Sequence, residues 1–129
     1  ALAQQVNLAG AVIVSTPQDI ALLDVVKALT MFQKASVPVL GMIENMSYWC
    51  CPDCGRIDHI FGEGGVKAEA KKRGIEMLGE IPISSQVRKS SDSGIPIIIS
   101  EPKSVQSKNY RNIAKAIIKS VKIDEEELV

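Results

Sequence analysis

The stretch GAVIVSTPQDIALLDV, residues 10–25, decides the fold class. Its first six residues are rich in Val and Ile, as expected of a strand that is covered on both faces. Ser, Thr and Pro then end the strand, and Asp19 can cap a helix from Ile20 to about Ala35. A second apolar run, VPVLGMIEN at residues 37–45, follows the helix. The order strand, helix, strand predicts two parallel strands joined by a right-handed crossover.

The remainder of the sequence continues this alternation. Apolar runs at residues 76–81 and 95–100 predict two more buried strands. A helix over residues 63–73, stopped by Gly74, precedes the first of these runs, and a long amphipathic helix capped by Ser104 follows the second. We therefore predict an α/β fold, a parallel β-sheet flanked by helices.

The domain organisation is expected to be simple. No repeat or interdomain linker divides the chain, and we predict one domain over residues 1–122, followed by an acidic tail at residues 123–129. The Ser-rich segment 84–94 is too short for a disordered hinge and predicts a loop or a single helical turn.

The charge balance argues against a nucleic-acid partner. Lys plus Arg and Asp plus Glu number 15 each, whereas phosphate binding needs a clustered positive surface. No apolar run is long enough to cross a bilayer, and the start of the sequence lacks the basic residues and apolar core of a signal peptide. We expect no membrane insertion and a reducing compartment, where thiols stay free or bind metal.

The stretch MSYWCCPDCG, residues 46–55, contains every cysteine of the chain. Two residues separate Cys51 from Cys54, so both sulfurs can point at one metal. Pro52 restricts the turn, and Gly55 allows backbone amides to approach the sulfurs. Zinc and the common iron–sulfur clusters take about four ligands, and the sequence has no second Cys-x-x-Cys. The motif is typical of a metal knuckle from which two ligands are missing.

Four interpretations of the cysteine pair stay open on this evidence. A zinc ribbon needs further ligands in the same chain, and only Cys50 and His59 are available. A thioredoxin-like redox pair is suggested by Trp49, although the motif does not clearly open a helix. Unreactive loop thiols are the plain alternative. A site completed by a two-fold partner brings four sulfurs together, and a bridging [4Fe–4S] cluster fits this arrangement best.

A nucleotide site does not follow from these patterns alone. The Gly-rich stretch FGEGGVKAEA, residues 61–70, lacks the Gly-Lys-Ser/Thr order of a P-loop, because Lys67 lies between Val66 and Ala68. It predicts a turn into a helix instead. Asn45 ends the second strand, where its carboxamide can donate and accept at once, as adenine recognition requires. Spacing alone leaves that role open.

Taken together, the motifs resemble those of a known family. The combination of ENMS (44–47), CPDC (51–54) and IFG (60–62) is far more specific than the Cys-x-x-Cys pair. Over most of residues 7–100 the chain resembles the Mrp or ApbC type of nucleotide-binding iron–sulfur cluster carrier, a family of deviant P-loop ATPases. The matching stretches, in chain order, are GAVIVSTPQDIALLDV, VPVLGMIENMSYWCCPDCG, IFGEGG, LGEIPI and RKSSDSGIPIIIS.

The resemblance implies a fold, a cargo and a set of site residues. Residues 1–122 would form the C-terminal part of a P-loop NTPase-like domain of the SIMIBI type. Cys51 and Cys54 of two subunits would hold one labile [4Fe–4S] cluster in a homodimer, for transfer to apo iron–sulfur proteins. Asn45 and Pro82 would lie near the adenine of ATP, which binds with Mg²⁺ in the full-length protein.

The resemblance also shows what this sequence lacks. The P-loop and the acidic Mg²⁺ residues of the family belong to an N-terminal half, so this chain alone is not expected to hydrolyse ATP, and its sheet is expected to expose apolar surface.

We expect a cytoplasmic protein, with the mitochondrial matrix as the alternative, because a mitochondrial branch is similar. Two other functions stay open: a zinc-stabilised dimerisation or binding module, and a Cys-x-x-Cys thiol oxidoreductase.

Overall fold

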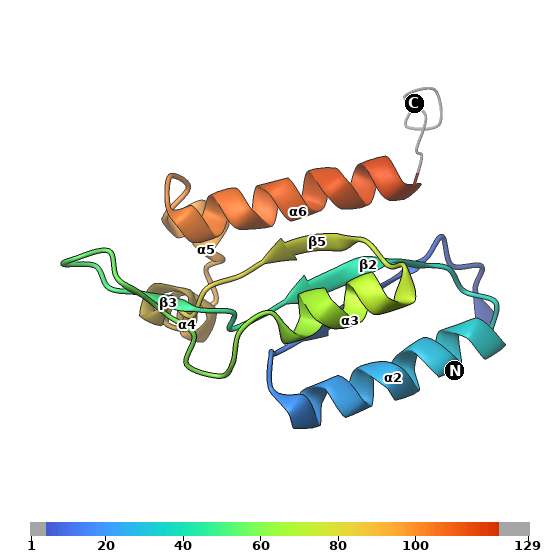
Figure 1. Cartoon of the computed structure of the whole chain (residues 1–129). Coiled ribbons are helices and arrows are strands. Elements are labelled where there is room, and N and C mark those ends of the chain that lie inside the picture. The colour runs from blue at the N-terminus through green and yellow to red at the C-terminus, as the bar shows by residue number, and fades with distance from the viewer. Residues whose placement is uncertain (1–4, 122–129) are drawn as a thin grey trace.

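The computed structural model describes residues 5–121 and has an α/β architecture. Three parallel strands form the main sheet in the order β1-β2-β5: β1 (Ala11–Ser15), β2 (Val39–Glu44) and β5 (Met77–Glu80). Helices α2 (Asp19–Lys34) and α3 (Gly65–Arg73) cover one face of the sheet, and α6 (Val105–Val121) covers the other (Figure 1). The predicted parallel sheet flanked by helices is confirmed.

Consecutive residues of the central strand belong to two separate cores. Met42 packs under α2 and α3, whereas Ile43 packs under α6, because successive side chains of a strand point to opposite faces. The first core is completed by Ile13, Val25, Leu29, Val66 and Ala70, and the second by Leu78, Ile81 and Ile113. Burial on both faces explains why β2 is a continuous apolar run in the sequence.

Strand β1 forms an edge of the sheet and is fully covered on one face only. Ile13 is buried beneath α2, whereas the next residue, Val14, is 57% exposed. The prediction that this strand is covered on both faces is therefore wrong, because α6 packs mainly over β5 and β2.

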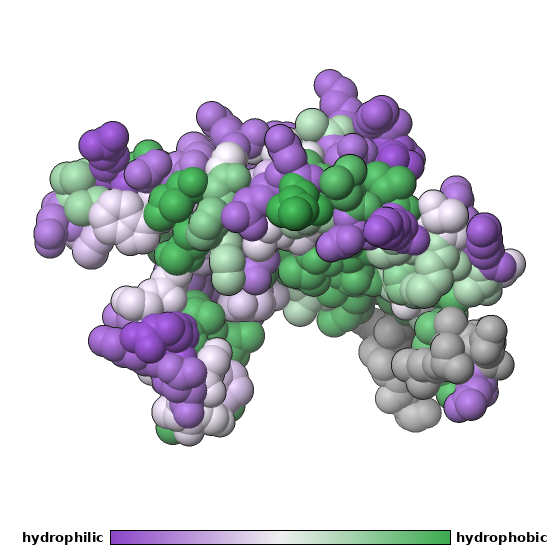
Figure 2. Space-filling model, turned by 90° about the horizontal axis from the view of Figure 1, so that it is seen from below, coloured by the Kyte–Doolittle hydropathy of each residue, from purple (hydrophilic) through white to green (hydrophobic). Residues whose placement is uncertain are grey.

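The expected exposure of apolar surface is confirmed. The outer side of α2 also carries exposed apolar side chains, among them Ile20, Leu23 and Met31. Seen from the side of α2, apolar surface extends across the centre of the molecule (Figure 2). Contiguous apolar surface of this kind is uncommon on monomeric soluble proteins and is typical of interaction surfaces.

Residues 95–100 form a helical corner, contrary to the predicted fourth strand. Helix α5 (Ile97–Ser100) follows Pro96, which has no N–H to offer a sheet and favours the start of a helical turn. The buried hydroxyl of Ser107 on α6 donates to the carbonyl oxygens of Ile97 and Glu101, at 3.1 and 2.7 Å. These bonds fix the corner to α6.

The segment 84–94 forms helix α4 (Ser85–Ser93) rather than the predicted loop or single turn. Ser84 Oγ accepts two backbone N–H groups of the first turn, at 3.2 and 3.4 Å, and Gly94 ends the helix with a left-handed φ of 78°. Capping at both ends stabilises a helix whose polar composition suggested a loop.

Two predicted caps have different outcomes. Asp19 does not cap α2, because Gln18 occupies the cap position and no side chain bonds there. Ser104 does cap α6, since its Oγ accepts the N–H of Ser107 at 3.1 Å.

The predicted acidic tail, residues 123–129, lies outside the described residues, so the boundary at residue 122 stays a prediction. Among the helices of residues 5–121, none is both long and apolar enough to cross a membrane.

Candidate functional site

The cysteines lie on a small β-hairpin beyond the carboxyl ends of the main strands. Its strands are β3 (Trp49–Cys50) and β4 (Ile57–Asp58), which pair antiparallel. The hairpin projects away from the sheet and its helices (Figure 1). A site at its tip is therefore open to another protein.

The tip of the hairpin is a tight, hydrogen-bonded turn. The N–H of Cys51 donates to the carbonyl of Arg56 at 2.8 Å, and the N–H of Gly55 donates to the carbonyl of Cys51 at 2.9 Å. Gly55 has a φ of 74°, a left-handed conformation that suits glycine. Cys51 is half-buried and Cys54 is exposed, and neither forms a disulfide. The turn thus presents two free thiols on one short loop.

The electrostatics of the turn favour a thiolate at Cys51. The backbone amide of Cys54, then the backbone amide of Asp53 and the thiol of Cys54, hydrogen-bond to its sulfur and lower the pKa of Cys51, against a smaller desolvation effect. Thiolate is the form that binds metal and that attacks disulfides. The geometry therefore suits either a metal ligand or a redox thiol.

The other candidate ligands do not join this pair. The thiol of Cys50 donates weakly to the carbonyl oxygens of Gly55 and Cys51, at 3.8 and 4.0 Å. His59 Nε2 faces Glu63 Oε1 at 3.7 Å, and its ring lies 6.3 Å from that of Tyr48. Over residues 5–121, no three His, Cys, Asp or Glu side chains form a group that could hold a metal ion. A four-ligand centre at this hairpin needs ligands from outside the described residues.

A buried glutamate ties the base of the hairpin to the core, and the sequence analysis missed it. Glu44, the last residue of β2, is 2% exposed. Its Oε2 accepts the hydroxyl of Ser47, and its Oε1 accepts the N–H of Val66 in the first turn of α3 at 3.3 Å. The available signal was a glutamate at the end of an apolar strand with a serine three residues later.

Backbone pairing continues beyond the main strands into this region. The N–H of Ile81 donates to the carbonyl of Glu44 at 2.8 Å, and that of Ser47 donates to the carbonyl of Ile81 at 2.9 Å. The N–H of Ile83 then donates to the carbonyl of Tyr48 at 2.7 Å. The segment that follows β5 therefore holds the base of the cysteine hairpin.

A groove of about 680 Å³ opens beside this hairpin base, and we call it the carboxyl-end groove. Both residues predicted to contact a nucleotide base, Asn45 and Pro82, line it. Met46, Arg88 and Tyr110 also line it. Open α/β sheets bind ligands outside the carboxyl ends of their strands, which is where this groove lies. The structure thus brings Asn45 and Pro82 together, while their contact with a nucleotide stays a prediction.

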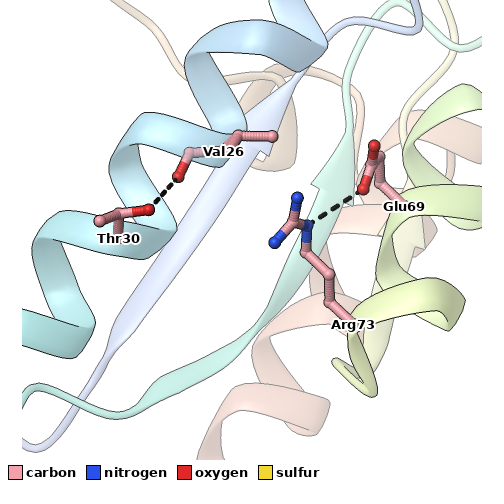
Figure 3. A network of polar contacts seen from close by, with 4 residues as sticks. All are labelled: Val26, Thr30, Glu69 and Arg73. Carbon is pink, nitrogen blue, oxygen red and sulfur yellow. Dashed lines mark hydrogen bonds and ion pairs between the residues drawn. The ribbon is translucent and has the colours of Figure 1, made fainter.

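A second groove, of about 540 Å³, lies between the C-terminal ends of α2 and α3. Thr30 and Arg73 face it from the two helices (Figure 3). Both are engaged elsewhere, because Thr30 bonds the carbonyl of Val26 at 3.0 Å and Arg73 pairs with Glu69 at 3.1 Å. This groove lies at the amino ends of the strands and contains none of the candidate site residues.

Comparison with known proteins decides the family. Residues 1–118 match the family of the NUBPL iron-transfer P-loop NTPase, of the ParA group. The chain belongs to this family. The resemblance to Mrp- and ApbC-type carriers is thereby confirmed, and the match covers both the cysteine hairpin and the carboxyl-end groove.

Curated relatives of the NUBPL family carry iron–sulfur names. The iron-sulfur cluster transfer protein NUBPL of Dictyostelium discoideum is 56% identical over 95% of this chain and 38% of its own length. The iron-sulfur protein required for NADH dehydrogenase, mitochondrial, of Arabidopsis thaliana is 45% identical over 94% of this chain and 39% of its own length. The iron-sulfur cluster carrier protein of Escherichia coli is 45% identical over 90% of this chain and 31% of its own length. The chain thus spans less than two-fifths of each relative.

Solved structures agree with the NUBPL family match. A nucleotide-binding protein from Archaeoglobus fulgidus in complex with ADP is 45% identical, with a TM-score of 0.63 over 74% of this chain and 38% of that protein. The cell division ATPase MinD of Pyrococcus furiosus, at 24% identity, has a TM-score of 0.68 over 86% of this chain and 43% of that protein. The second likeness concerns the fold alone and confirms a P-loop NTPase-like architecture.

Proposed function

We propose that this chain binds an iron–sulfur cluster as cargo through Cys51 and Cys54 and passes it to apo iron–sulfur proteins. The observation that carries the proposal is the hairpin tip, where Cys54 is exposed, Cys51 is half-buried, both thiols are free and backbone amides favour the thiolate of Cys51. A carrier must release its cluster, so ligands on a projecting tip suit it better than ligands in a closed core. The iron–sulfur names of the relatives support this choice of cargo.

We further propose that two copies of the chain share one [4Fe–4S] cluster. Such clusters take about four thiolates, and the hairpin supplies two. A two-fold axis at the hairpin tips would bring four sulfurs together from identical surfaces, and two-fold dimers are the commonest oligomers. Cys50 is left out, because over residues 5–121 it forms no group of three metal-ligating side chains with Cys51 and Cys54, and its thiol donates to backbone carbonyls.

The carboxyl-end groove is proposed to receive the adenine of ATP. Asn45 would bond the base edge with its carboxamide, and Pro82 would contact the ring. The phosphates and Mg²⁺ would be held by parts of the longer protein, because this sequence has no Gly-Lys-Ser/Thr phosphate loop. ATP hydrolysis is not expected of this chain alone, and in the full-length protein it would gate loading or release of the cluster.

The recipients are proposed to be apo iron–sulfur proteins, with no nucleic-acid partner and no membrane insertion. Three free cysteines fit a reducing compartment. We propose the cytoplasm, with the mitochondrial matrix as the alternative. The relatives include one protein named as mitochondrial and one carrier from a bacterium, so their names are compatible with either compartment.

Anaerobic reconstitution with iron and sulfide tests the cargo and the dimer together. We expect about four iron and four acid-labile sulfide per dimer, a broad visible absorption band, and the mass of a dimer. A colourless monomer would contradict the cluster proposal. A colourless dimer with about one tightly held zinc would favour the zinc-stabilised binding module instead.

A thiol oxidoreductase remains the second candidate, because the pKa of Cys51 is lowered and Cys54 lies two residues away. It predicts that the Cys51 thiolate attacks a substrate disulfide and releases one thiol, and that Cys54 then displaces the second thiol to form a Cys51–Cys54 disulfide, which an added external dithiol reduces for the next turnover. Disulfide reduction by the metal-free chain, lost in both cysteine variants, would favour this function over the carrier.

Asn45→Ala is expected to weaken the binding of ADP by about 5- to 30-fold, since losing hydrogen bonds to a base costs roughly 1–2 kcal/mol. Isothermal titration of the two proteins with ADP measures the change. Asn112→Ala is the matched control, because Asn112 is exposed on α6 and does not line the groove. Equal ADP affinity in Asn45→Ala and wild type would contradict the proposed base contact.

A further inference from the structure

One residue of the cysteine hairpin also lines the carboxyl-end groove. Trp49 shares this groove with Asn45 and Pro82 and is 38% exposed. It belongs to β3, pairs with Asp58 across the hairpin, and precedes Cys51 by two residues. A ligand in the groove can therefore contact the hairpin without any intervening side chain.

The groove offers the surfaces that a planar heteroaromatic ring needs. Trp49 and Tyr110 contribute aromatic rings from two different elements, β3 and α6. Pro82 adds a buried ring, and Met46 adds an adaptable apolar side chain. Stacking on aromatic side chains, together with an amide at the ring edge, is how proteins commonly hold nucleobases. The indole is thus a suitable wall for the base that Asn45 is proposed to bind.

The hairpin is attached to the body of the protein only near its base. Its last backbone bonds to the segment after β5 are those of Ser47 and Tyr48, and β3 and β4 then pair only with each other in the described sheets. Met46, in the turn between groove and hairpin, has a left-handed φ of 52°, which is uncommon for a residue other than glycine. An element held this way is expected to open more readily than the main sheet.

We propose that Trp49 contacts the nucleotide base and couples occupancy of the groove to the order of the cysteine hairpin. A base stacked on the indole holds β3 against the groove, and this restricts the turn that presents Cys51 and Cys54. By thermodynamic linkage, a cluster bound to those thiols in turn tightens nucleotide binding. The inference rests on the nucleotide role proposed for the groove, and it deepens that role by naming the residue that links the two sites.

The metal-free chain allows a direct test with ADP as the probe. Trp49 is the only tryptophan of the chain, so its fluorescence reports on the groove without labelling. Saturating ADP is expected to shift or quench this emission. Amide hydrogen exchange over residues 49–58 is expected to slow about fivefold, because exchange there follows the open population of the hairpin.

Three variants separate the coupling from simple binding. In Trp49→Ala, saturating ADP should leave exchange over residues 49–58 unchanged, whereas Trp49→Phe keeps an aromatic face and should restore the slowing. Arg88→Ala is the matched control, because Arg88 lines the same groove from α4 and does not belong to the hairpin. It should weaken ADP binding and still show the slowing at saturation.

The outcomes distinguish this inference from the proposed function. ADP binding with unchanged Trp49 emission, or with equal exchange in the presence and absence of ADP, overturns the coupling and leaves the nucleotide role standing. Equal slowing in Trp49→Ala and wild type also overturns it. Absence of any ADP binding overturns both the nucleotide role and the coupling. Failure to assemble a cluster overturns the cargo alone, because this experiment uses no metal.

Discussion

Replacing either Cys51 or Cys54 by serine is expected to reduce reconstituted iron and sulfide to background. The hydroxyl of serine keeps the size of the side chain but does not supply the thiolate that iron–sulfur clusters require. One substitution removes two ligands from a site that two chains share, so retention should collapse rather than halve. Iron, acid-labile sulfide and visible absorption after anaerobic desalting measure the effect.

Cys50→Ser is the matched control for these variants. Cys50 lies on the same hairpin, is exposed, and its thiol donates only weakly to two backbone carbonyls. It should retain wild-type iron and sulfide. The three variants should also melt at similar temperatures, since none removes a buried side chain. Loss of the cluster in Cys50→Ser would show that the cysteine pair is not the complete ligand set of one chain.

Glu44→Ala is expected to destabilise the fold by about 3 kcal/mol or more, because it removes the carboxylate that accepts two hydrogen bonds and leaves a cavity. The Ser47 hydroxyl and the Val66 N–H would lose their acceptor in a region where Glu44 is 2% exposed. A loss of this size corresponds to a fall of roughly 10 °C in melting temperature for a domain of this length. Thermal and urea unfolding followed by circular dichroism measure it.

Two comparisons sharpen this prediction. Glu76→Ala removes an exposed glutamate between α3 and β5 and should change stability by less than about 0.5 kcal/mol. Glu44→Gln keeps an acceptor for the N–H of Val66, so its loss of stability should lie between those of Glu44→Ala and Glu76→Ala. If Glu44→Ala were as stable as Glu76→Ala, the bonds from Glu44 to Ser47 and Val66 would not be what holds the hairpin base to α3.

Sequence patterns predicted the elements whose burial matches their periodicity. The runs at residues 10–15, 37–45 and 76–81 became strands of a parallel sheet, and α2 and α3 form the crossovers between them. The run at 95–100 forms a helical corner instead of the predicted strand, because Pro96 has no N–H for a sheet and favours a helical turn. Helix α4 was missed because its stability comes from caps at its ends rather than from an apolar face.

Some residues of the candidate site were predictable from the sequence, and others depend on tertiary contacts. The Cys-x-x-Cys spacing and its family context identified Cys51 and Cys54 without any structure, since two residues between ligands define a knuckle locally. Glu44 belongs to the ENMS motif, but its role was not predicted, because its partners lie three and 22 positions away and a glutamate is usually exposed. In the sequence Trp49 is only a neighbour of the cysteines, and its place in the carboxyl-end groove depends on how the base of the hairpin is bonded to the segment after β5.

The sequence by itself determined the parallel α/β class, the cysteine pair and the family, because these depend on local periodicity, ligand spacing and motif order. The tertiary structure alone decided that the pair lies on a projecting hairpin and that Trp49 shares a groove with Asn45 and Pro82. It also decided that Glu44 joins the hairpin base to α3. The groove and the glutamate link depend on residues distant in the chain, since Pro82 meets Trp49 and Asn45, and Val66 meets Glu44. No local pattern encodes such contacts.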